Sequence, residues 1–235
     1  MNGVPSHAMV LAAGLGLRMR PLTIDRPKPL IEVAGRTMLD RVLDHLDRVG
    51  CANKVVNAHW RADRVRAHLA PRIDVVISDE PDLLETGGGV AKALNLLGAA
   101  PFYVCNADII WEDEGASALA RLAAAYQPET MDALLLLQPV ATAFGYDGKG
   151  DFHLRTDGRL RRRDAGEDTP FLFAGVQILH PRLFADHPGG AFSLNLLYDR
   201  AQAADRLFGL AHDGRWYHVG TPSALAEAEA LLRRS

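Results

Sequence analysis

LAAGLGLRMRPLTIDRPKPL, residues 11–30, is the stretch of sequence that decides the fold. An apolar run at 9–12 predicts the end of a buried strand, and Gly14 and Gly16 predict a turn directly after it. Glycine lets the backbone approach a ligand closely and adopt positive φ, and the exposed N–H groups of such a turn form an anion-binding nest. Cations follow within eleven residues, and three of them, Arg18, Arg20 and Lys28, suit a polyphosphate.

This stretch fits neither of the two commonest glycine-rich phosphate motifs. A P-loop ends in Gly-Lys-Ser/Thr, whereas Arg18 and Met19 stand at that place. The dinucleotide fingerprint needs a third glycine where this chain has Met19, which argues against a nicotinamide dehydrogenase. Two interpretations remain, a phosphate loop of another type and an ordinary strand-to-helix turn with solvated arginines. The segment Pro27-Lys28-Pro29 favours the first, because it fixes a cation beside the turn.

Composition sets further limits. The 235 residues are 48% hydrophobic and 23% charged, which is typical of a globular chain, and we predict a single domain over residues 1–235. The net charge of −3 gives no basic footprint for nucleic acid. Cys51 and Cys105 are too few for a disulfide framework or a cysteine metal site, so we expect buried thiols. Because the chain lacks a long apolar run and a signal peptide, we expect no membrane partner and a cytoplasmic location.

Strands and helices alternate along the first part of the chain. The hydrophobic periodicity predicts strands at 9–12, 53–58, 74–78, 101–106 and 133–140, and helices at 37–49, 63–69, 88–97 and 115–126. Thr37 with Asp40 resembles a capping box, and Gly50 is placed to end that helix. This alternation predicts a Rossmann-like α/β fold with a mostly parallel sheet covered on both faces. Ligands bind at the carboxyl ends of such strands, so the loops after Ala12 and Asn106 should share one edge.

The pattern changes after residue 143. Strands at 152–154 and 160–162 flank Thr156-Asp157-Gly158, which predicts a hairpin. A further strand is expected at 171–179 and a helix at 194–204. Strands at 207–211 and 216–219 flank Asp213-Gly214 and predict a second hairpin. Thr221 and Pro222 form a good start for a closing helix that runs through Leu232.

Two short segments add candidate chemistry at the predicted sheet edge. Glu85-Thr86-Gly87-Gly88-Gly89 opens a helix, and its glycines offer close approach and free N–H donors, although a tight turn into a helix would use the same residues. Asn106-Ala107-Asp108 follows a central strand, where a carboxylate is well placed to hold Mg²⁺. A loop aspartate that caps a helix is the alternative for Asp108.

Taken together, these motifs identify a resemblance to the sugar-1-phosphate nucleotidyltransferases. The pattern of that family is L-x-x-G-x-G-x-R-M-x-P-L-T followed by P-K-P-L, and it is matched densely in the first third of this chain. Shorter matches reach residue 222. The resemblance implies a nucleotide-diphospho-sugar transferase (GT-A-like) fold, with a nucleotide-binding half at about 8–140 and a sugar-binding half at about 141–235. It also implies attack by a sugar 1-phosphate on the α-phosphorus of a nucleoside triphosphate, with release of pyrophosphate.

The resemblance assigns roles to individual residues. It implies that Arg18 neutralises the departing β- and γ-phosphates, that Lys28 bridges the α-phosphate and the sugar phosphate, and that Asp108 holds the catalytic Mg²⁺. Glu85, Thr86 and Gly87 would read the edge of the nucleobase, for which uracil or thymine is expected. The implied nucleotide contacts are Leu11, Ala12, Ala13, Gly14, Gly16, Leu17, Arg18, Lys28, Glu85, Thr86 and Gly87. The implied sugar contacts are Asn106, Gly145, Asp164 and Gly175.

Position 218 departs from the family pattern, which is W-x-D-x-G-T-P with the aspartate as the second metal ligand. This chain has Trp216-Tyr217-His218 before Val-Gly-Thr-Pro. Imidazole is a poor ligand for Mg²⁺, so His218 is a candidate ligand for a softer ion such as Mn²⁺, a contact to metal-bound water, a phosphate-binding cation or a residue at the rim of the site. A non-catalytic nucleotide-sugar sensor is the alternative class of function, supported only by this substitution.

The sugar end is less clearly defined by the sequence. Where many relatives carry Glu-Lys-Pro, this chain has Arg161, Arg162, Arg163 and Asp164. One of these arginines would neutralise the sugar phosphate or a sugar carboxylate, or the segment is a solvated basic hairpin. Phe144, Phe171 and Phe173 are candidate pocket walls, with a role in the core as the default.

Within the family, the chain looks most like the N-acetylmuramate-1-phosphate uridylyltransferases of peptidoglycan recycling. This resemblance implies that UTP and N-acetylmuramic acid α-1-phosphate are the substrates and that the product is a UDP-sugar. A mannose-1-phosphate guanylyltransferase is the alternative within the class. We expect a monomer or a weak homodimer with Mg²⁺, or Mn²⁺ in its place.

Overall fold

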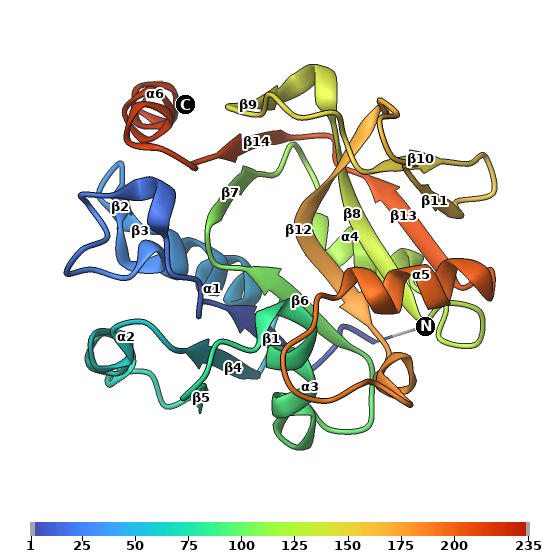
Figure 1. Cartoon of the computed structure of the whole chain (residues 1–235), viewed down its shortest axis with the longest axis horizontal. Coiled ribbons are helices and arrows are strands. Elements are labelled where there is room, and N and C mark those ends of the chain that lie inside the picture. The colour runs from blue at the N-terminus through green and yellow to red at the C-terminus, as the bar shows by residue number, and fades with distance from the viewer. Residues whose placement is uncertain (1–2, 234–235) are drawn as a thin grey trace.

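The computed structural model describes residues 3–233 as an α/β fold built on one large mixed sheet (Figure 1). The parallel part of this sheet has the order β6-β1-β4-β5. β12 continues the sheet beside β6 and runs antiparallel to it, and β8 and the hairpin β10–β11 pair with β12. β13 pairs with β8 in parallel. The predicted α/β class with a mainly parallel central sheet is therefore confirmed.

Most predicted elements form close to the expected bounds. The strands of the large sheet are β1 (His7–Leu11), β4 (Asn53–Ala58), β5 (Val75–Asp79), β6 (Phe102–Asn106), β8 (Ala133–Pro139), β10 (Phe152–Leu154), β11 (Leu160–Arg162), β12 (Phe171–Leu179) and β13 (Leu207–Ala211). The helices are α1 (Met38–Arg48), α2 (Ala62–Leu69), α3 (Glu85–Leu97), α4 (Ala118–Ala125), α5 (Asn195–Ala203) and α6 (Pro222–Leu232).

Two helices, α1 and α6, begin at side-chain caps that the sequence predicted. The Thr37 hydroxyl accepts the Asp40 N–H at 3.0 Å at the start of α1. The Thr221 hydroxyl accepts the Ala224 N–H at 3.2 Å at the start of α6. Each bond satisfies a backbone donor that the first helical turn leaves without a partner.

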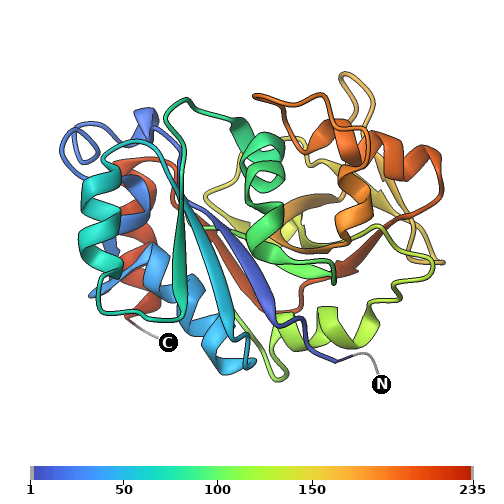
Figure 2. The same cartoon turned by 90° about the horizontal axis from the view of Figure 1, so that it is seen from below.

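Helices cover both faces of the large sheet (Figure 2). The apolar sides of α1, α2 and α4 pack on one face around Val10 and Val56. α3 and α5 pack on the other face around Met9 and Val104. Cys51 and Cys105 are both buried and free, as predicted. Within residues 3–233, no helix is long and apolar enough to cross a membrane.

The predicted hairpin between 207–211 and 216–219 is wrong. β13 pairs with β8 in the large sheet, whereas β14 (Arg215–His218) lies in a separate three-stranded sheet between β7 (Ile109–Glu112) and β9 (Ala143–Phe144). A bend at Gly214 passes the chain from one sheet to the other. β7, β9 and the small pair β2 (Glu32–Val33) and β3 (Arg36–Thr37) were not predicted, because strands of two to four residues carry too little periodicity.

This small sheet places position 218 beside the central edge. In β14, His218 pairs with Ile109, the residue that follows Asp108. On its other edge β14 pairs with β9, and Gly145 directly after β9 packs closely on His218. A Cβ on Gly145 would lie 2.8 Å from the His218 carbonyl oxygen. The sheet edge therefore brings residues from distant parts of the chain together.

Candidate active site

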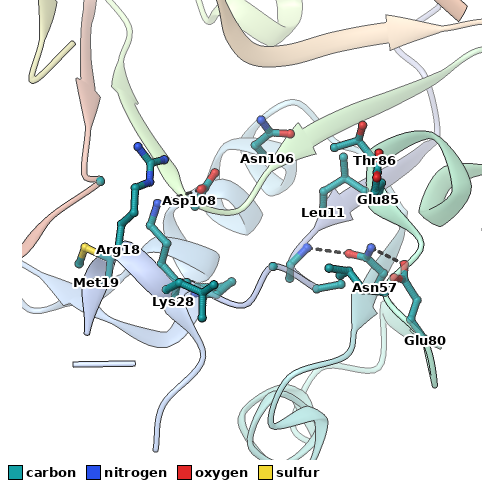
Figure 3. Close-up of a pocket in the computed structure, with 18 of the residues that line it drawn as sticks. Leu11, Arg18, Met19, Lys28, Asn57, Glu80, Glu85, Thr86, Asn106 and Asp108 are labelled. Carbon is teal, nitrogen blue, oxygen red and sulfur yellow. Dashed lines mark hydrogen bonds and ion pairs between the residues drawn. The ribbon is translucent and has the colours of Figure 1, made fainter. Parts of the chain in front are cut away.

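A cavity of about 650 Å³ opens at the carboxyl ends of β1, β4, β5 and β6 (Figure 3). The register pairs Leu11 at the end of β1 with Asn106 at the end of β6, which confirms that the loops after these strands share an edge. Most of the predicted nucleotide contacts line the cavity. Its lining is Leu11, Ala12, Ala13, Gly14, Gly16, Leu17, Arg18, Met19, Lys28, Pro29, Asn57, Glu80, Leu83, Glu85, Thr86, Asn106, Asp108, Ser193 and Gly220.

The glycine loop is held in place by Thr23. Gly16 has φ of 61°, and a Cβ there would lie only 3.0 Å from Thr23 and 3.1 Å from Lys28. The buried Thr23 hydroxyl donates to the Gly16 carbonyl oxygen at 2.8 Å. Glycine is therefore required both by the backbone angle and by the close packing of the loop on itself.

Lys28 and Asp108 form an ion pair at the wall of the cavity. The Lys28 Nζ lies 2.8 Å from the Asp108 Oδ2. The lysine is nearly buried, with 7% of its surface exposed, and it sits in a 3₁₀ turn that spans Lys28–Leu30. The Asp108 side chain remains 44% exposed, so its carboxylate has room for a further ligand. The predicted proximity of these two residues is thus present in the fold.

Arg18 lies beside this pair and points into the same space (Figure 3). Within residues 3–233, no carboxylate forms an ion pair with Arg18 in this structure. Its charge is therefore available for an anion. Arg18, Lys28 and Asp108 together give this end of the cavity one net positive charge.

His218 faces the same end of the cavity through Gly220. Its Nε2 lies 2.9 Å from the place that a Cβ on Gly220 would take, and Gly220 lines the cavity. Burial lowers the pKa of His218 below its usual value, and the positive charges of Lys28 and Arg18 lower it further. Without a bound anion the imidazole is therefore mainly neutral at pH 7, and binding a phosphate as a cation would require it to take up a proton.

A metal ion would need oxygen ligands from the substrates. In the part of the chain that the structure describes, no group of three or more His, Cys, Asp or Glu side chains could hold one. Magnesium is commonly held by one or two carboxylates together with substrate phosphates. The half-exposed carboxylate of Asp108 fits this mode of binding, and His218, whose pKa is affected by the charge of Asp108, is a further candidate.

The Gly87 and Gly88 amides at the start of α3, predicted to be free donors, are bonded within the protein. The amides of Gly87 and Gly88 both donate to the Phe192 carbonyl oxygen, at 2.8 and 3.1 Å. A Cβ on Gly87 would clash with the Phe192 ring, and this glycine does not line the cavity. The glycines therefore serve close packing against the chain at 190–194, and Glu85 and Thr86 alone from this motif face the cavity. Glu85 has φ of 59°, a left-handed conformation that is unusual for a residue with a side chain.

Asn57 and Glu80 also line the cavity, and neither was predicted from the sequence to be a site residue. The Asn57 Oδ1 accepts the Ala12 N–H at 2.6 Å, and the Asn57 Nδ2 donates to the Glu80 Oε1 at 2.6 Å. The Ala12 N–H is therefore not available to a nucleotide. Both residues stand at the carboxyl ends of predicted strands, which is the signal that would have found them.

The predicted sugar contacts divide into two groups. Asn106 lines the cavity, and a Cβ on Gly175 would lie 3.1 Å from the Asn106 Nδ2. Gly175 stands at a register shift between β12 and β8 and has φ of 80°. Gly145 lies against His218, as described above. Asp164 does not join this group, because its side chain is 88% exposed and pairs with Arg161 at 3.2 Å.

The structure distinguishes the three adjacent arginines. Arg161 is bonded to Glu167, and Arg162 makes two bonds to Asp199 at 2.7 and 2.9 Å. The Arg163 guanidinium donates to the Glu167 carbonyl oxygen at 3.3 Å and has no carboxylate partner among the described residues. Burial and the charge of Asp151 raise the pKa of Tyr146, and the Arg163 guanidinium partly opposes this rise. The positive side chain of Arg163 therefore lies near the loop that follows Gly145.

The candidate aromatic walls lie mainly in the core. Phe144 packs against Tyr217 with ring centroids 5.6 Å apart. Phe171 and Phe173 pack on the cluster beneath α5. None of the three lines the cavity.

Comparison with known proteins places this geometry in a family. The model of the MobA-like NTP transferase domain matches residues 8–146. A protein of Caulobacter vibrioides named N-acetylmuramate alpha-1-phosphate uridylyltransferase is 48% identical over 99% of both chains. The chain belongs to the NTP transferase family. It is a nucleotidyltransferase, and the resemblance found in its sequence motifs is confirmed.

Further relatives differ in how much of the chain they match. A protein of the same name from Neisseria meningitidis serogroup B is 36% identical over 95% of this chain and 97% of its own. A mannose-1-phosphate guanylyltransferase catalytic subunit beta of Drosophila melanogaster is 34% identical, but over only 46% of this chain and 31% of its own length. The guanylyltransferase likeness is therefore partial.

Solved structures share the fold at low sequence identity. A putative glucose-1-phosphate thymidylyltransferase from Bacillus anthracis superposes with a TM-score of 0.83 over 97% of this chain, at 16% identity. A UDP-glucose pyrophosphorylase in complex with UDP-glucose gives a TM-score of 0.79 over 97%, also at 16% identity. The expected GT-A-like fold of the nucleotidyltransferases is confirmed.

Proposed function

We propose that this protein transfers the uridylyl group of UTP to N-acetylmuramic acid α-1-phosphate and releases pyrophosphate. The observation that carries the proposal is the 48% identity to a uridylyltransferase of that name along 99% of the chain. The cavity supports it with a cationic phosphate end and a cluster of predicted sugar-facing residues around Asn106. The product would be a UDP-sugar that feeds cell-wall synthesis through peptidoglycan recycling.

The reaction needs alignment more than proton transfer. The second pKa of a phosphate monoester is about 6, so the attacking sugar phosphate is mostly a dianion at pH 7. We assign Arg18 to the departing β- and γ-phosphates, since its charge is uncompensated. We assign Lys28 to the α-phosphate and the sugar phosphate, because its Nζ is held at the cavity wall by Asp108. These groups bring two anions together and stabilise the charge that shifts to the leaving pyrophosphate.

Asp108 is the residue that we assign to Mg²⁺. Its carboxylate is half-exposed and faces the phosphate end, and phosphate oxygens would complete the ligand set. When bound, the ion would add positive charge between the two phosphates. His218 is a second, softer candidate ligand, and with it Mn²⁺ becomes a candidate for the physiological ion.

The nucleobase would lie at the other end of the cavity. Glu85, Thr86 and Leu11 border that end with Ser193. Uracil, which is small, suits a cavity of about 650 Å³ that also has to hold the ribose and three phosphates.

Arg163 is the arginine that we assign to the sugar substrate. N-acetylmuramic acid carries a carboxylate that N-acetylglucosamine lacks, and Arg163 alone of the three arginines has no carboxylate partner among residues 3–233. Arg163→Met should raise KM for N-acetylmuramate 1-phosphate by about tenfold and leave KM for N-acetylglucosamine 1-phosphate unchanged, because only the first loses an ion pair. Arg162→Met is the matched control, since Arg162 is engaged with Asp199. An equal rise in KM for both sugar phosphates would mean that Arg163 binds the phosphate group that they share. An unchanged KM for both would mean that Arg163 is a solvated residue of the hairpin.

Pyrophosphate release by the purified protein tests the proposed function. UTP, dTTP, GTP and CTP are crossed with the 1-phosphates of N-acetylmuramate, N-acetylglucosamine, glucose and mannose, each with Mg²⁺ and with Mn²⁺. Release only with UTP and N-acetylmuramate 1-phosphate is the expected result. Release with GTP and mannose 1-phosphate would keep the mechanism and overturn the specificity.

The sensor alternative predicts a different outcome of the same panel. It requires nucleotide-sugar binding without release of pyrophosphate, and His218 is its only support. The presence of Arg18, Lys28 and Asp108 around one cavity argues against it. A cytoplasmic location and a monomeric or weakly dimeric state stay predictions, to be checked by fractionation and by light scattering.

A further inference from the structure

The peptide unit between Leu11 and Ala12 is held by hydrogen bonds on both sides. Its carbonyl oxygen, on Leu11, accepts the N–H of Ala107 at 3.0 Å. Its N–H, on Ala12, donates to the Asn57 Oδ1 at 2.6 Å. Because β1 ends at Leu11, this peptide sets the direction in which the glycine loop leaves the sheet.

Asn57 is oriented in turn by Glu80. The Asn57 Nδ2 donates to the Glu80 Oε1 at 2.6 Å (Figure 3). The Leu84 N–H donates to the Glu80 Oε2 at 3.2 Å. A flipped Asn57 amide would turn its NH₂ group toward the Ala12 N–H and its oxygen toward the carboxylate, so only one orientation satisfies both neighbours. Glu80 therefore determines which atom Asn57 offers to the loop.

Both side chains are buried at the cavity wall. Asn57 is 2% exposed and Glu80 is 3% exposed. A Cβ on Gly89 would lie 2.7 Å from the Glu80 Oε1 and 2.9 Å from the Asn57 Nδ2, so α3 packs directly on the pair. A buried carboxylate is costly unless it is fully bonded, and apolar side chains would fill the same space at lower cost. The pair therefore calls for an explanation beyond packing.

We propose that Asn57 and Glu80 are positioning residues for nucleotidyl transfer. They hold the Leu11–Ala12 peptide, and through it the glycine loop, in the orientation that receives the triphosphate. The Ala107 bond ties the same peptide to the segment that carries Asp108, so one peptide sets the loop and the carboxylate relative to each other. This inference rests on the proposed function in one respect: UTP and N-acetylmuramate 1-phosphate are the substrates used in the assay.

A reciprocal exchange of the two side chains tests the pair. Asn57→Asp alone brings two carboxylates to the 2.6 Å contact, and Glu80→Gln alone leaves one of its two donor neighbours without an acceptor. In the double variant, the new carboxylate at 57 accepts from Ala12 and from the amide at 80, and the amide oxygen at 80 accepts from Leu84. Every hydrogen bond and the total charge are restored.

The expected kinetics separate positioning from mere stability. We expect kcat/KM for UTP to fall by about 100-fold in Asn57→Asp and about tenfold in Glu80→Gln, and to return to within about threefold of the parent in the double variant. KM for the sugar phosphate should stay constant throughout. Loss of folded protein alone would lower kcat and leave both KM values unchanged. Tyr103→Phe, which removes a buried hydrogen bond of 2.9 Å to Leu119, is the matched control and should retain the parent kcat/KM.

Hydrogen exchange of the Ala12 amide gives a readout that needs no turnover. We expect this amide to exchange at least about tenfold faster in Asn57→Asp than in the parent, and to regain its protection in the double variant. A parent protein inactive with UTP would refute the proposed function and leave this test intact. The positioning role is overturned if the double variant is as impaired as Asn57→Asp, if the Ala12 amide exchanges equally in all variants, or if Glu80→Gln changes the preference among UTP, CTP and GTP, which would make Glu80 a base contact.

Discussion

Replacing Lys28 by methionine should disable turnover while leaving the fold in place. The phosphate end of the cavity holds two cations and one carboxylate, with His218 neutral at pH 7 because its pKa is lowered. Lys28→Met removes one cation and frees Asp108 from the contact at 2.8 Å, so the net charge facing the triphosphate drops from positive to zero. Both changes weaken the stabilisation of the phosphates in the transition state.

The expected size of the effect follows from that geometry. Removing one preorganised electrostatic group from a transition state typically costs about 10²–10³ in kcat, or about 3–4 kcal/mol. Stability should change much less, because Asp108 is 44% exposed and water replaces its partner. Such an exposed partner limits the net value of the ion pair to about 1 kcal/mol, which corresponds to about 2–4 °C in Tm for a chain of this size.

A double-mutant cycle with Asp108→Asn makes the test specific. The two residues are in contact, so the loss in the Lys28→Met/Asp108→Asn double variant should be smaller than the product of the two single losses. The assay is pyrophosphate release at saturating UTP and sugar phosphate, together with Tm for each variant. Lys54→Met is the matched control, because Lys54 is also buried and paired, at 2.6 Å with Asp74, and belongs to the other end of β4. It should lose stability and keep kcat.

Three outcomes would refute this reasoning about Lys28. A kcat for Lys28→Met within about threefold of the parent would show that Lys28 does not stabilise the phosphates in the transition state. Fully multiplicative losses in the cycle would show that Lys28 and Asp108 act separately. A loss of kcat in the Lys54 control as large as that in Lys28→Met would mean that any buried lysine matters equally.

Three further predictions concern other parts of the molecule. Gly87→Ala should lower stability by about 1–3 kcal/mol and raise KM for UTP, because the new methyl group pushes against Phe192 and the neighbouring cavity wall; an unchanged Tm would contradict this. His218→Asp should lower the ratio of activity in Mn²⁺ to activity in Mg²⁺ by about tenfold, since carboxylates suit Mg²⁺ better than imidazole does, and an unchanged ratio would remove His218 from the metal. Asp74→Ala should cost about 2 kcal/mol at pH 7, measured by urea unfolding. Hydrogen bonds from Arg72 and Lys54 lower the folded pKa of Asp74, so its stabilisation is present above the unfolded value of about 4, and the gap between parent and variant should close as the pH falls below 4.

The predictable part of the fold is the part in which local signals agree with tertiary packing. α1 combines a side-chain cap at Thr37, an apolar stripe and a stop at Gly50, and it forms within a residue or two of the predicted bounds. The failed hairpin at Asp213-Gly214 shows the opposite case. The chain bends at Gly214, but the strands on either side pair with β8 and β7 and not with each other. Strand pairing over long sequence distances is not encoded in a turn, so periodicity alone could not choose between these partners.

Charged residues in short motifs can be recognised without knowledge of the fold, so Arg18, Lys28 and Asp108 were predicted from the sequence to share one site. Arg18, Lys28 and Asp108 meet at one wall although Asp108 lies 80 residues from Lys28 along the chain. Gly87 and Gly88 gave rise to a wrong prediction. A glycine that allows close packing against Phe192 looks the same in the sequence as a glycine that allows a ligand to approach the backbone.

Asn57 was missed for the converse reason. Its role depends on a partner that the sequence does not place beside it, since Glu80 reaches it from the end of the neighbouring strand. A polar residue that ends a buried strand has two explanations, contact with the ligand or support of a backbone that contacts the ligand. The bond to the Ala12 N–H distinguishes them here, because an Asn57 whose acceptor and donor are both engaged within the protein acts on the nucleotide through the loop. The same argument applies to the other strands that end at this edge. Where every polar atom of such a residue is bonded inside the protein, its substitution should change KM for the nucleotide through the shape of the loop and leave the preference among bases unchanged.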